Sequence, residues 1–327
     1  MLRCFLLFAA AFTAGAAGLD LEWERGVEVP DPSAAYSAAV CPDGTFYLAD
    51  GIGGVAVVGG QGALRARRAD QPEFRGTRLA ACDGAGRLYL SSRAPAQGVL
   101  TVLELGRPGE LRVVNRLDTG VAVRHLAFGR NGLMFAAGTR PGSLLPLHAI
   151  GPGGAVLFSF GEPGPAFILP RQPPDGFVFW LERSGRVLFV PRHAYELRVY
   201  DARGRHLETV PARPPGVIRP AQGAAENEVA GAAALPDGGI AVQASRPDGR
   251  GLRTPAWSID LYGPDLGKPA SLPSLPGILA GADADGGLYF ITVAAREIAV
   301  AKGTVKRPGR QRFLAGVTEK DTRVTIR

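Results

Sequence analysis

The chain has 327 residues, of which 46% are hydrophobic and 20% are charged, and its 45 glycines and 27 prolines are spread along the sequence. This composition excludes a collagen-like or disordered protein and favours many short strands joined by turns. The net charge is +7, and only four of the 37 basic residues are lysines, so arginine carries most of the positive charge.

The excess of arginine has two interpretations. Arginine binds carboxylate or phosphate through paired hydrogen bonds, so its abundance is compatible with an anionic partner. A codon bias would raise arginine together with alanine, glycine and proline, and we favour this bias as the source of the total. The positions of the arginines, rather than their number, therefore decide whether a binding surface exists.

The first 16 residues have the pattern of a cleaved signal peptide. Arg3 precedes an apolar stretch over residues 5–12, and small residues at 14–16 suit cleavage before Ala17. The apolar stretch is too short to cross about 30 Å of hydrocarbon as a helix. We therefore expect an exported protein, periplasmic or extracellular, with no membrane span.

Export would place Cys41 and Cys82 in oxidising surroundings, where a disulfide can form. Each cysteine follows the small-residue strand of its own repeat, so the two positions are nearly equivalent. Adjacent packed sheets lie about 10 Å apart, whereas a disulfide needs Cα atoms roughly 4.4–6.8 Å apart. We expect two buried free thiols, and a disulfide only if irregular backbone around residues 82–86 brings the cysteines closer.

One motif recurs six times along the chain: a small-residue strand, a tight turn ending in glycine, and an apolar strand. Glycine accepts the positive φ that such turns require. The turn glycines are Gly44, Gly86, Gly132, Gly185, Gly238 and Gly286. A period in the forties with about four strands per repeat and no helical pattern is typical of a propeller blade. The sequence therefore predicts an all-β fold, a six-bladed β-propeller of four-stranded antiparallel blades.

The predicted strands follow in chain order. They are 36–40, 45–49, 55–58 and 64–68; 79–82, 87–91, 99–105 and 111–117; 124–128, 133–137, 144–150 and 155–160; 177–182, 186–191, 195–200 and 205–210; 232–235, 239–244, 257–262 and 268–272; then 278–282, 287–293 and 297–305. In the fourth repeat, the pair Asp175-Gly176 also fits the turn, which leaves its register open by one strand. The sixth repeat lacks a fourth strand, and residues 19–29 alternate like a spare one. We expect this N-terminal strand to complete the last blade, because an open ring would leave an unpaired edge.

The segment 186–210 carries a family resemblance. Within it, Leu197, Val199, Tyr200, Asp201 and Gly204 fall where an NHL-type repeat has its apolar pair, aromatic residue, acid and turn glycine. Glu196 departs from the pattern, because that family usually has arginine there. The chain thus resembles NHL-repeat or TolB-like six-bladed propellers, in pattern over residues 19–305 and sharply in this blade. The resemblance implies a binding platform, with enzymes as a minority.

Related propellers of the gluconolactonase and senescence-marker group hydrolyse lactones or esters with a divalent metal over the central channel. Such a site needs several converging oxygen ligands. The candidates here are few: Asn115, Asn131, Asn227, Asp50, Glu226 and Glu228. The four histidines lack metal-binding spacing, and no nucleophile or phosphate-loop motif is present. We expect no catalytic residue, no metal and no cofactor, and keep a lactonase-type hydrolase as the alternative.

A binding surface is predicted from the loops between second and third strands, which emerge on one face of a propeller. Five of these six loops carry arginine, and one also carries a histidine. The predicted site residues are Arg93, Arg140, Arg192, His193, Arg246, Arg250, Arg253 and Arg296. Such a ring would attract an anionic ligand or acidic protein, although glutamates lie in connections on the same face.

These observations combine into one expectation for the whole chain. Residues 1–16 are a signal peptide, 17–307 the propeller and 308–327 a C-terminal extension. We expect an exported, non-catalytic binding or scaffold module for a protein or an anionic ligand, with no nucleic-acid partner. The alternatives are the lactonase-type hydrolase and a structural subunit of a larger exported assembly.

Overall fold

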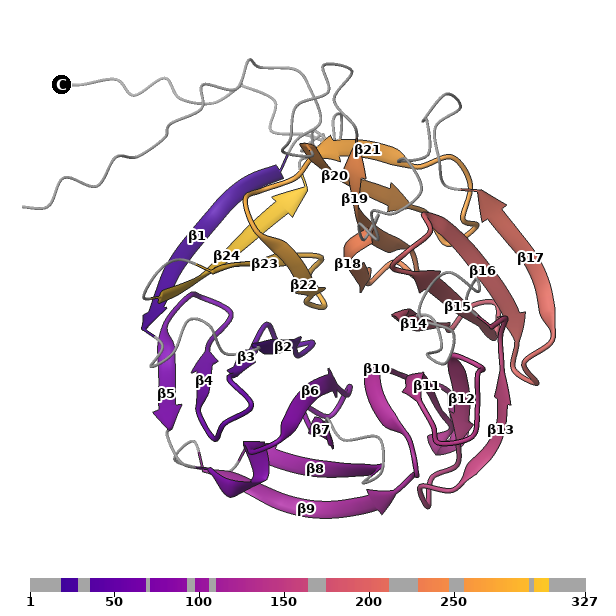
Figure 1. Cartoon of the computed structure of the whole chain (residues 1–327). Coiled ribbons are helices and arrows are strands. Elements are labelled where there is room, and N and C mark those ends of the chain that lie inside the picture. Colours follow the sequence, from indigo (N-terminus) through magenta and orange to yellow (C-terminus); the bar gives the residue numbers. More distant parts are fainter. Residues whose placement is uncertain are drawn as a thin grey trace, which may run out of the picture.

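The computed structural model describes residues 19–28, 36–68, 71–92, 98–105, 110–163, 175–211, 229–246, 256–293 and 297–305. Within these ranges, six four-stranded antiparallel sheets form a ring around a central axis (Figure 1). The predicted six-bladed β-propeller is thereby confirmed. The predicted signal peptide and C-terminal extension lie outside the described residues.

The first three blades follow each other along the chain, and in each the strands pair in sequence order. Blade one contains β2 (Ser37–Val40), β3 (Phe46–Ala49), β4 (Val55–Val58) and β5 (Leu64–Arg68). Blade two contains β6 (Thr77–Cys82), β7 (Leu88–Ser92), β8 (Val99–Leu105) and β9 (Leu111–Asp118). Blade three contains β10 (Ala122–Phe128), β11 (Met134–Thr139), β12 (Leu147–Ile150) and β13 (Val156–Phe160).

The second half of the ring repeats this arrangement. Blade four contains β14 (Gly176–Leu181), β15 (Arg186–Pro191), β16 (Glu196–Asp201) and β17 (His206–Pro211). Blade five contains β18 (Val229–Ala234), β19 (Ile240–Arg246), β20 (Ala256–Tyr262) and β21 (Ala270–Pro273). Blade six contains β22 (Ile278–Ala282), β23 (Leu288–Val293), β24 (Glu297–Val305) and β1 (Leu19–Glu28). Gly176 therefore begins the inner strand of blade four, which settles the register that the sequence left open.

Helix is almost absent from the described residues. Two short 3-10 helices occur there, η1 (Pro72–Phe74) and η2 (Arg130–Gly132). None of the described segments forms a helix with the length and apolar character needed to cross a bilayer.

The N-terminal strand closes the ring, as predicted. β1 pairs antiparallel with β24, from Leu19 opposite Val305 to Glu28 opposite Glu297. Val27 is buried, and the Trp23 indole donates from Nε1 to the Gly60 carbonyl of blade one at 3.1 Å. The last blade thus receives its outer strand from the other end of the chain, and the edge of β24 is covered.

The repeated turns have the conformation that the sequence predicted. The turn glycines all have positive φ, between 63° at Gly185 and 87° at Gly238. Each turn joins the inner strand of a blade to the second strand. The glycine repeat therefore sets the position of every inner strand around the axis.

The hydrophobic core is divided among the six spaces between neighbouring blades. The described residues form six apolar clusters, and each cluster joins two adjacent blades. Between blades three and four, for example, Phe135 stacks on Trp180 with 5.5 Å between ring centroids. Each blade is consequently held through its two broad faces, and the inner strands remain free to line the axis.

Hydrogen bonds between blades satisfy the inner edge of the sheets. In five inner strands, one backbone N–H finds an acceptor on the preceding blade. With the donor N–H named first, the bonds run from Leu79 to Ser37 Oγ (2.9 Å), from Val123 to Ser91 Oγ (2.8 Å), from Val178 to His125 Nδ1 (3.3 Å), from Val229 to the Arg192 carbonyl (3.1 Å), and from Leu279 to Gln243 Oε1 (2.8 Å). An inner strand has no neighbouring strand on its axial side, so these bonds replace the missing ladder.

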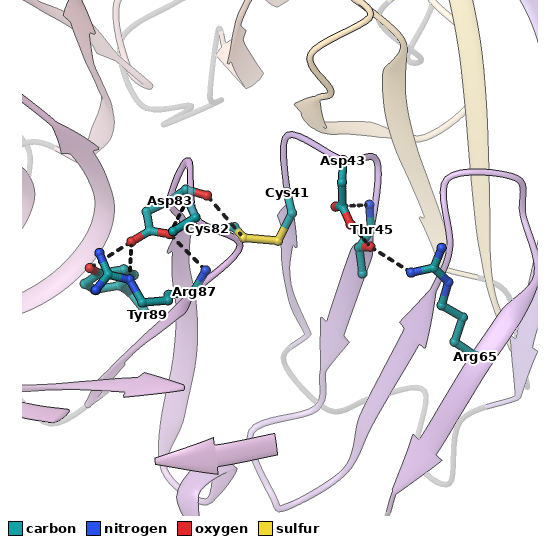
Figure 2. The surroundings of a disulfide bond; sticks show 9 residues. Cys41, Asp43, Thr45, Arg65, Cys82, Asp83, Arg87 and Tyr89 are labelled. Carbon is teal, nitrogen blue, oxygen red and sulfur yellow. Dashed lines mark hydrogen bonds and ion pairs between the residues drawn. A yellow bond between two sulfur atoms is a disulfide. The ribbon is translucent and has the colours of Figure 1, made fainter. Parts of the chain in front are cut away.

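Cys41 and Cys82 form a disulfide, with 5.0 Å between their Cα atoms. Figure 2 shows the bond joining the turn after β2 to the end of β6. The expectation of two free thiols is therefore wrong. It used the spacing of packed sheets, but inner strands converge toward the axis, and a bulge between Leu79 and Ala81 shifts β6 by one residue.

Candidate functional site

A central channel runs along the axis of the propeller. Its cavity measures about 640 Å³ and is lined by residues of the inner strands β2, β6, β10, β14, β18 and β22. These six strands surround the centre of the ring (Figure 1). The lining reaches from Tyr36, before β2, at one end of the channel to Cys82, the last residue of β6, and Asp283, directly after β22, at the other end. This volume lies within the range of about 300–1,000 Å³ that is usual for small-molecule sites.

Bulges turn one residue of four inner strands out of the regular pairing. The bulged residues are Ala80, Arg124, Ala230 and Ala280, and all four line the channel. Bulges re-aim side chains and are frequent beside functional sites. Three of these four bulged residues are alanine, so Arg124 is the one among them that has a long charged side chain.

Arg124 and Arg192 converge on one carboxylate. Asp175 Oδ2 lies 2.5 Å from Arg124 Nη1 and 3.6 Å from Arg192 Nε. The other oxygen, Oδ1, accepts the N–H of Gly176 at 2.9 Å. The side chains of Arg124, Asp175 and Arg192 are 36%, 32% and 31% exposed, so the cluster is only partly dehydrated.

Each member of this cluster comes from a different local structure. Arg124 is the bulged residue of β10, Asp175 directly precedes β14, and Arg192 directly follows β15. Together with Arg78 of β6, they lie at the end of the channel where the inner strands begin, which we call the arginine end. Among the described residues that line this end, the charged side chains are Arg78, Arg124, Arg192 and Asp175.

Arg192 is held in place by further contacts. Its guanidinium carbon lies 4.4 Å from the centre of the Phe177 ring, and its Nη1 donates to the Ala230 carbonyl at 3.1 Å. Burial lowers the pKa of Arg192; Asp175 raises it, and the like charge of Arg124 lowers it further. The guanidinium stays charged at neutral pH, and the partly dehydrated charge would be stabilised by an additional anion.

His125 lies next to Arg124 in the channel wall. Its Nδ1 accepts the N–H of Val178, and its ring meets Phe177 and Phe179 edge-on at 5.5 and 5.2 Å. Burial lowers the pKa of His125 to about 4, so the ring is neutral at physiological pH. With Nδ1 occupied as an acceptor, Nε2 carries the proton and is available as a donor.

The opposite end of the channel contains the second carboxylate of the wall, Asp283. Its Oδ2 accepts from Lys302 Nζ at 3.1 Å and from the Tyr289 hydroxyl at 3.0 Å, and its Oδ1 accepts the Gly287 N–H at 2.8 Å. Asp175 and Asp283 therefore lie at different ends of the channel, each bound to its own cation. Across the part of the chain that the structure describes, no three His, Cys, Asp or Glu side chains are grouped so as to hold a metal ion.

The sequence matches no family model and no curated protein. Solved structures with a similar fold include a putative gluconolactonase, which is 15% identical with a TM-score of 0.50 and covers 90% of this chain and 94% of that chain. Virginiamycin B lyase from Staphylococcus aureus is 11% identical, with a TM-score of 0.47 and coverage of 84% and 82%. A protein of unknown function from Bacteroides caccae is 16% identical, with a TM-score of 0.48 and coverage of 73% and 81%. At 15% identity, the similarity to the putative gluconolactonase shows the propeller fold alone.

The predicted site residues do not all lie at one place in the structure. Arg192 lines the channel, His193 follows it and is half-buried, and Arg140 is exposed in the turn after β11. Arg246 is the last residue of β19. The other predicted arginines, Arg93, Arg250, Arg253 and Arg296, lie outside the described residues. Their role in binding stays a prediction.

Sequence reasoning missed three members of the arginine end: Arg78, Arg124 and Asp175. The predicted site residues all come from the loops between second and third strands, whereas Arg78 and Arg124 lie in inner strands. The sequence did contain a signal for these arginines, because most residues of the predicted inner strands are small and an arginine among them stands out. An arginine within such a strand is costly unless it meets an anion, and here Asp175 supplies only part of the negative charge.

Proposed function

We propose that the protein is an exported, non-catalytic binding module that holds an anionic ligand at the arginine end of its channel. The observation that carries this proposal is the convergence of Arg124 and Arg192 on the single carboxylate of Asp175. Among the described residues of this cluster, two guanidinium groups share one carboxylate, at the end of a cavity of about 640 Å³. Buried or half-buried cations without full compensation attract anions more strongly than exposed ones do.

Export is supported by the disulfide between Cys41 and Cys82. Disulfides persist mainly in oxidising compartments and are rare in the reducing cytosol. The bond therefore agrees with the signal-peptide pattern of the first 16 residues, and both favour a periplasmic or extracellular protein.

The non-catalytic part of the proposal is supported by the arrangement of the acidic groups. A hydrolase of the lactonase type would need several oxygen ligands directed at one metal ion. The two carboxylates of the described wall, Asp175 and Asp283, lie at opposite ends and bind Arg124 and Lys302. An Arg-rich end suits binding of an anion better than coordination of a cation.

The test is a binding measurement on the full chain with a panel of small anions at constant ionic strength. We expect at least one anion to bind, and Arg124→Gln to weaken that binding about tenfold or more, because hydrogen bonds to charged groups contribute about 1.5–3 kcal/mol. Arg183→Gln is the matched control, since Arg183 is exposed on the opposite face, in the turn after β14. Equal losses in both variants, or no binding of any anion, would refute the proposal.

A further inference from the structure

The turns that follow the inner strands of blades one, two and six have equivalent hydrogen bonds. The first residues after these strands are Cys41, Asp83 and Asp283. Each donates its N–H to the carbonyl four residues later, at 2.8–3.0 Å. Two residues beyond each acceptor stand Tyr47, Tyr89 and Tyr289. Blade one therefore has a cysteine at the position where blades two and six have an aspartate.

The hydroxyls of the three tyrosines differ in what they bind. Tyr89 donates to Asp83 at 3.2 Å (Figure 2), and Tyr289 donates to Asp283 at 3.0 Å. Each of these two hydroxyls is thus bound to an anion. Tyr47 is only 2% exposed, and its hydroxyl has no hydrogen-bond partner among the described residues.

Tyr47 and Cys41 line the same small cavity, which measures about 310 Å³. Burial, together with the charge of Asp43, raises the pKa of Tyr47 to about 12, so the hydroxyl is a donor at neutral pH. A negative charge on Cys41 would give this hydroxyl the kind of partner that its two equivalents have. Opening of the disulfide produces that charge when Cys41 is released as a thiolate.

The other sulfur of the disulfide belongs to a different cavity. Cys82 is half-buried and lines the central channel, at the end opposite to the arginine end, whereas Cys41 is 1% exposed. Cys82 Sγ lies 3.9 Å from the carbonyl oxygen of Asp83. A carbonyl oxygen accepts from a thiol but repels a thiolate, so Cys82 is the poorer leaving group. Access and leaving-group stability therefore favour attack on the same sulfur.

From these relationships we propose that the disulfide is a site of thiol–disulfide exchange with a small thiol that enters the channel. The thiolate of the incoming molecule attacks Cys82 Sγ, the bond to Cys41 breaks, and its electron pair stays on Cys41. The products are a mixed disulfide on Cys82 and a Cys41 thiolate that accepts the hydrogen bond of Tyr47. The reverse attack by Cys41 releases the thiol, so no other oxidant or reductant takes part. This proposal is independent of anion binding at the arginine end.

Charged groups around the small cavity act in both directions on a thiolate. Asp43 and Glu104 line the cavity and disfavour a thiolate, although Glu104 lies 3.9 Å from Arg112. The charge of Arg65, from β5, favours a thiolate in the same way as it favours ionisation of Tyr47. Substitution of Tyr47 by phenylalanine leaves all these charges in place, so it isolates the contribution of the hydroxyl.

The first experiment determines which sulfur is attacked. The oxidised full chain is treated briefly with 2-mercaptoethanol, an uncharged thiol, and free thiols are then trapped with N-ethylmaleimide. Peptide mass mapping identifies the group on each cysteine. We expect mercaptoethanol on Cys82 and maleimide on Cys41, at least tenfold in excess over the reverse arrangement. This measurement uses the wild type, so it does not depend on the folding of any variant.

The second experiment tests the role of the tyrosine hydroxyl. Tyr47→Phe should slow the exchange about threefold or more and raise the pKa of Cys41 in the reduced protein by about one unit or more. The pKa is obtained from the pH dependence of Cys41 alkylation. Tyr89→Phe is the matched control, because it removes the equivalent hydroxyl of blade two and should leave the pKa of Cys41 unchanged. A role of Tyr47 in packing alone would change stability in denaturant without changing that pKa.

Each part of the proposal can fail separately. A native disulfide that does not react with the thiol would overturn the exchange site. Mercaptoethanol found mainly on Cys41, or equally on both cysteines, would overturn the direction of attack. An unchanged pKa of Cys41 in Tyr47→Phe, or the same increase in Tyr89→Phe, would overturn the role of Tyr47.

Discussion

Cys41 and Cys82 connect two neighbouring blades at the axis, because Cys41 directly follows β2 and Cys82 ends β6. The bond spans 41 residues of sequence, which is almost a whole blade. Figure 2 shows that Asp83, the next residue, binds Arg87 and Tyr89 of the same blade. The disulfide therefore attaches the turn after β2 of blade one to the turn after β6 of blade two, and the hydrogen bonds of Asp83 already stabilise that second turn.

Removal of the disulfide should destabilise the protein by about 4 kcal/mol, because a closed loop of about 40 residues restricts the unfolded chain. The comparison is urea unfolding of the wild type and the double variant C41A/C82A. Dithiothreitol should lower the stability of the wild type to that of the variant and should not affect the variant itself. A wild type that is insensitive to reductant would contradict this prediction.

Deletion of residues 19–28 should abolish the monomer. Without β1, the nine residues of β24 become an exposed strand edge, and such edges recruit other chains. Size-exclusion chromatography should show oligomers or aggregate for the deletion variant, whereas we expect the full chain to elute as a monomer. A synthetic peptide of residues 19–28 should restore the monomer in part, whereas a scrambled peptide should not. A deletion variant that stays folded and monomeric alone would show that the ring closes without β1.

Lys302→Ala should cost about 3 kcal/mol of stability, in the range for breaking a buried ion pair from one side. Lys302 Nζ lies 3.1 Å from Asp283 and 3.2 Å from Glu22 of β1, so its loss leaves the buried Asp283 without its cation. Lys268→Ala is the control, because Lys268 is exposed and its loss should change stability by less than about 0.5 kcal/mol. Similar small effects from both substitutions in chemical denaturation would argue against a structural role for the pair.

Acid should destabilise the fold through His148 in β12. Burial lowers the pKa of His148 to about 4 from the ordinary value of 6.5, and the ring lies 2.8 Å from Ser159 through Nδ1. The neutral ring contributes full stability above pH 6.5. As pH falls from 6.5 to 4, the unfolded chain binds a proton that the folded chain does not, so stability decreases by about 3 kcal/mol.

The variant His148→Asn isolates this contribution. Between pH 7 and pH 4.5, the wild type should lose about 2–3 kcal/mol more unfolding free energy than the variant, because carboxylate titration is common to both. The measurement is urea unfolding at both pH values. The same acid sensitivity in both proteins would mean that His148 protonates in the folded state without cost.

Local patterns in the sequence were sufficient for the fold. The recurring turn glycines and the alternating apolar strands predict six blades because positive φ and a two-residue period are properties of the local chain. The spare strand at residues 19–28 and the missing strand in the last repeat predict how the ring closes. Both features are visible without any knowledge of which distant residues meet.

The disulfide and the arginine end were decided by distances between residues of different blades. The disulfide depended on the convergence of inner strands at the axis and on a one-residue bulge in β6, and neither is encoded in the spacing of the cysteines. The arginine end likewise needed the ring itself, because Arg124 and Asp175 lie on different blades, 51 residues apart in sequence. Sequence patterns specify what each blade is, whereas these contacts depend on how neighbouring blades pack, which brings together side chains that are 41 and 51 residues apart along the chain.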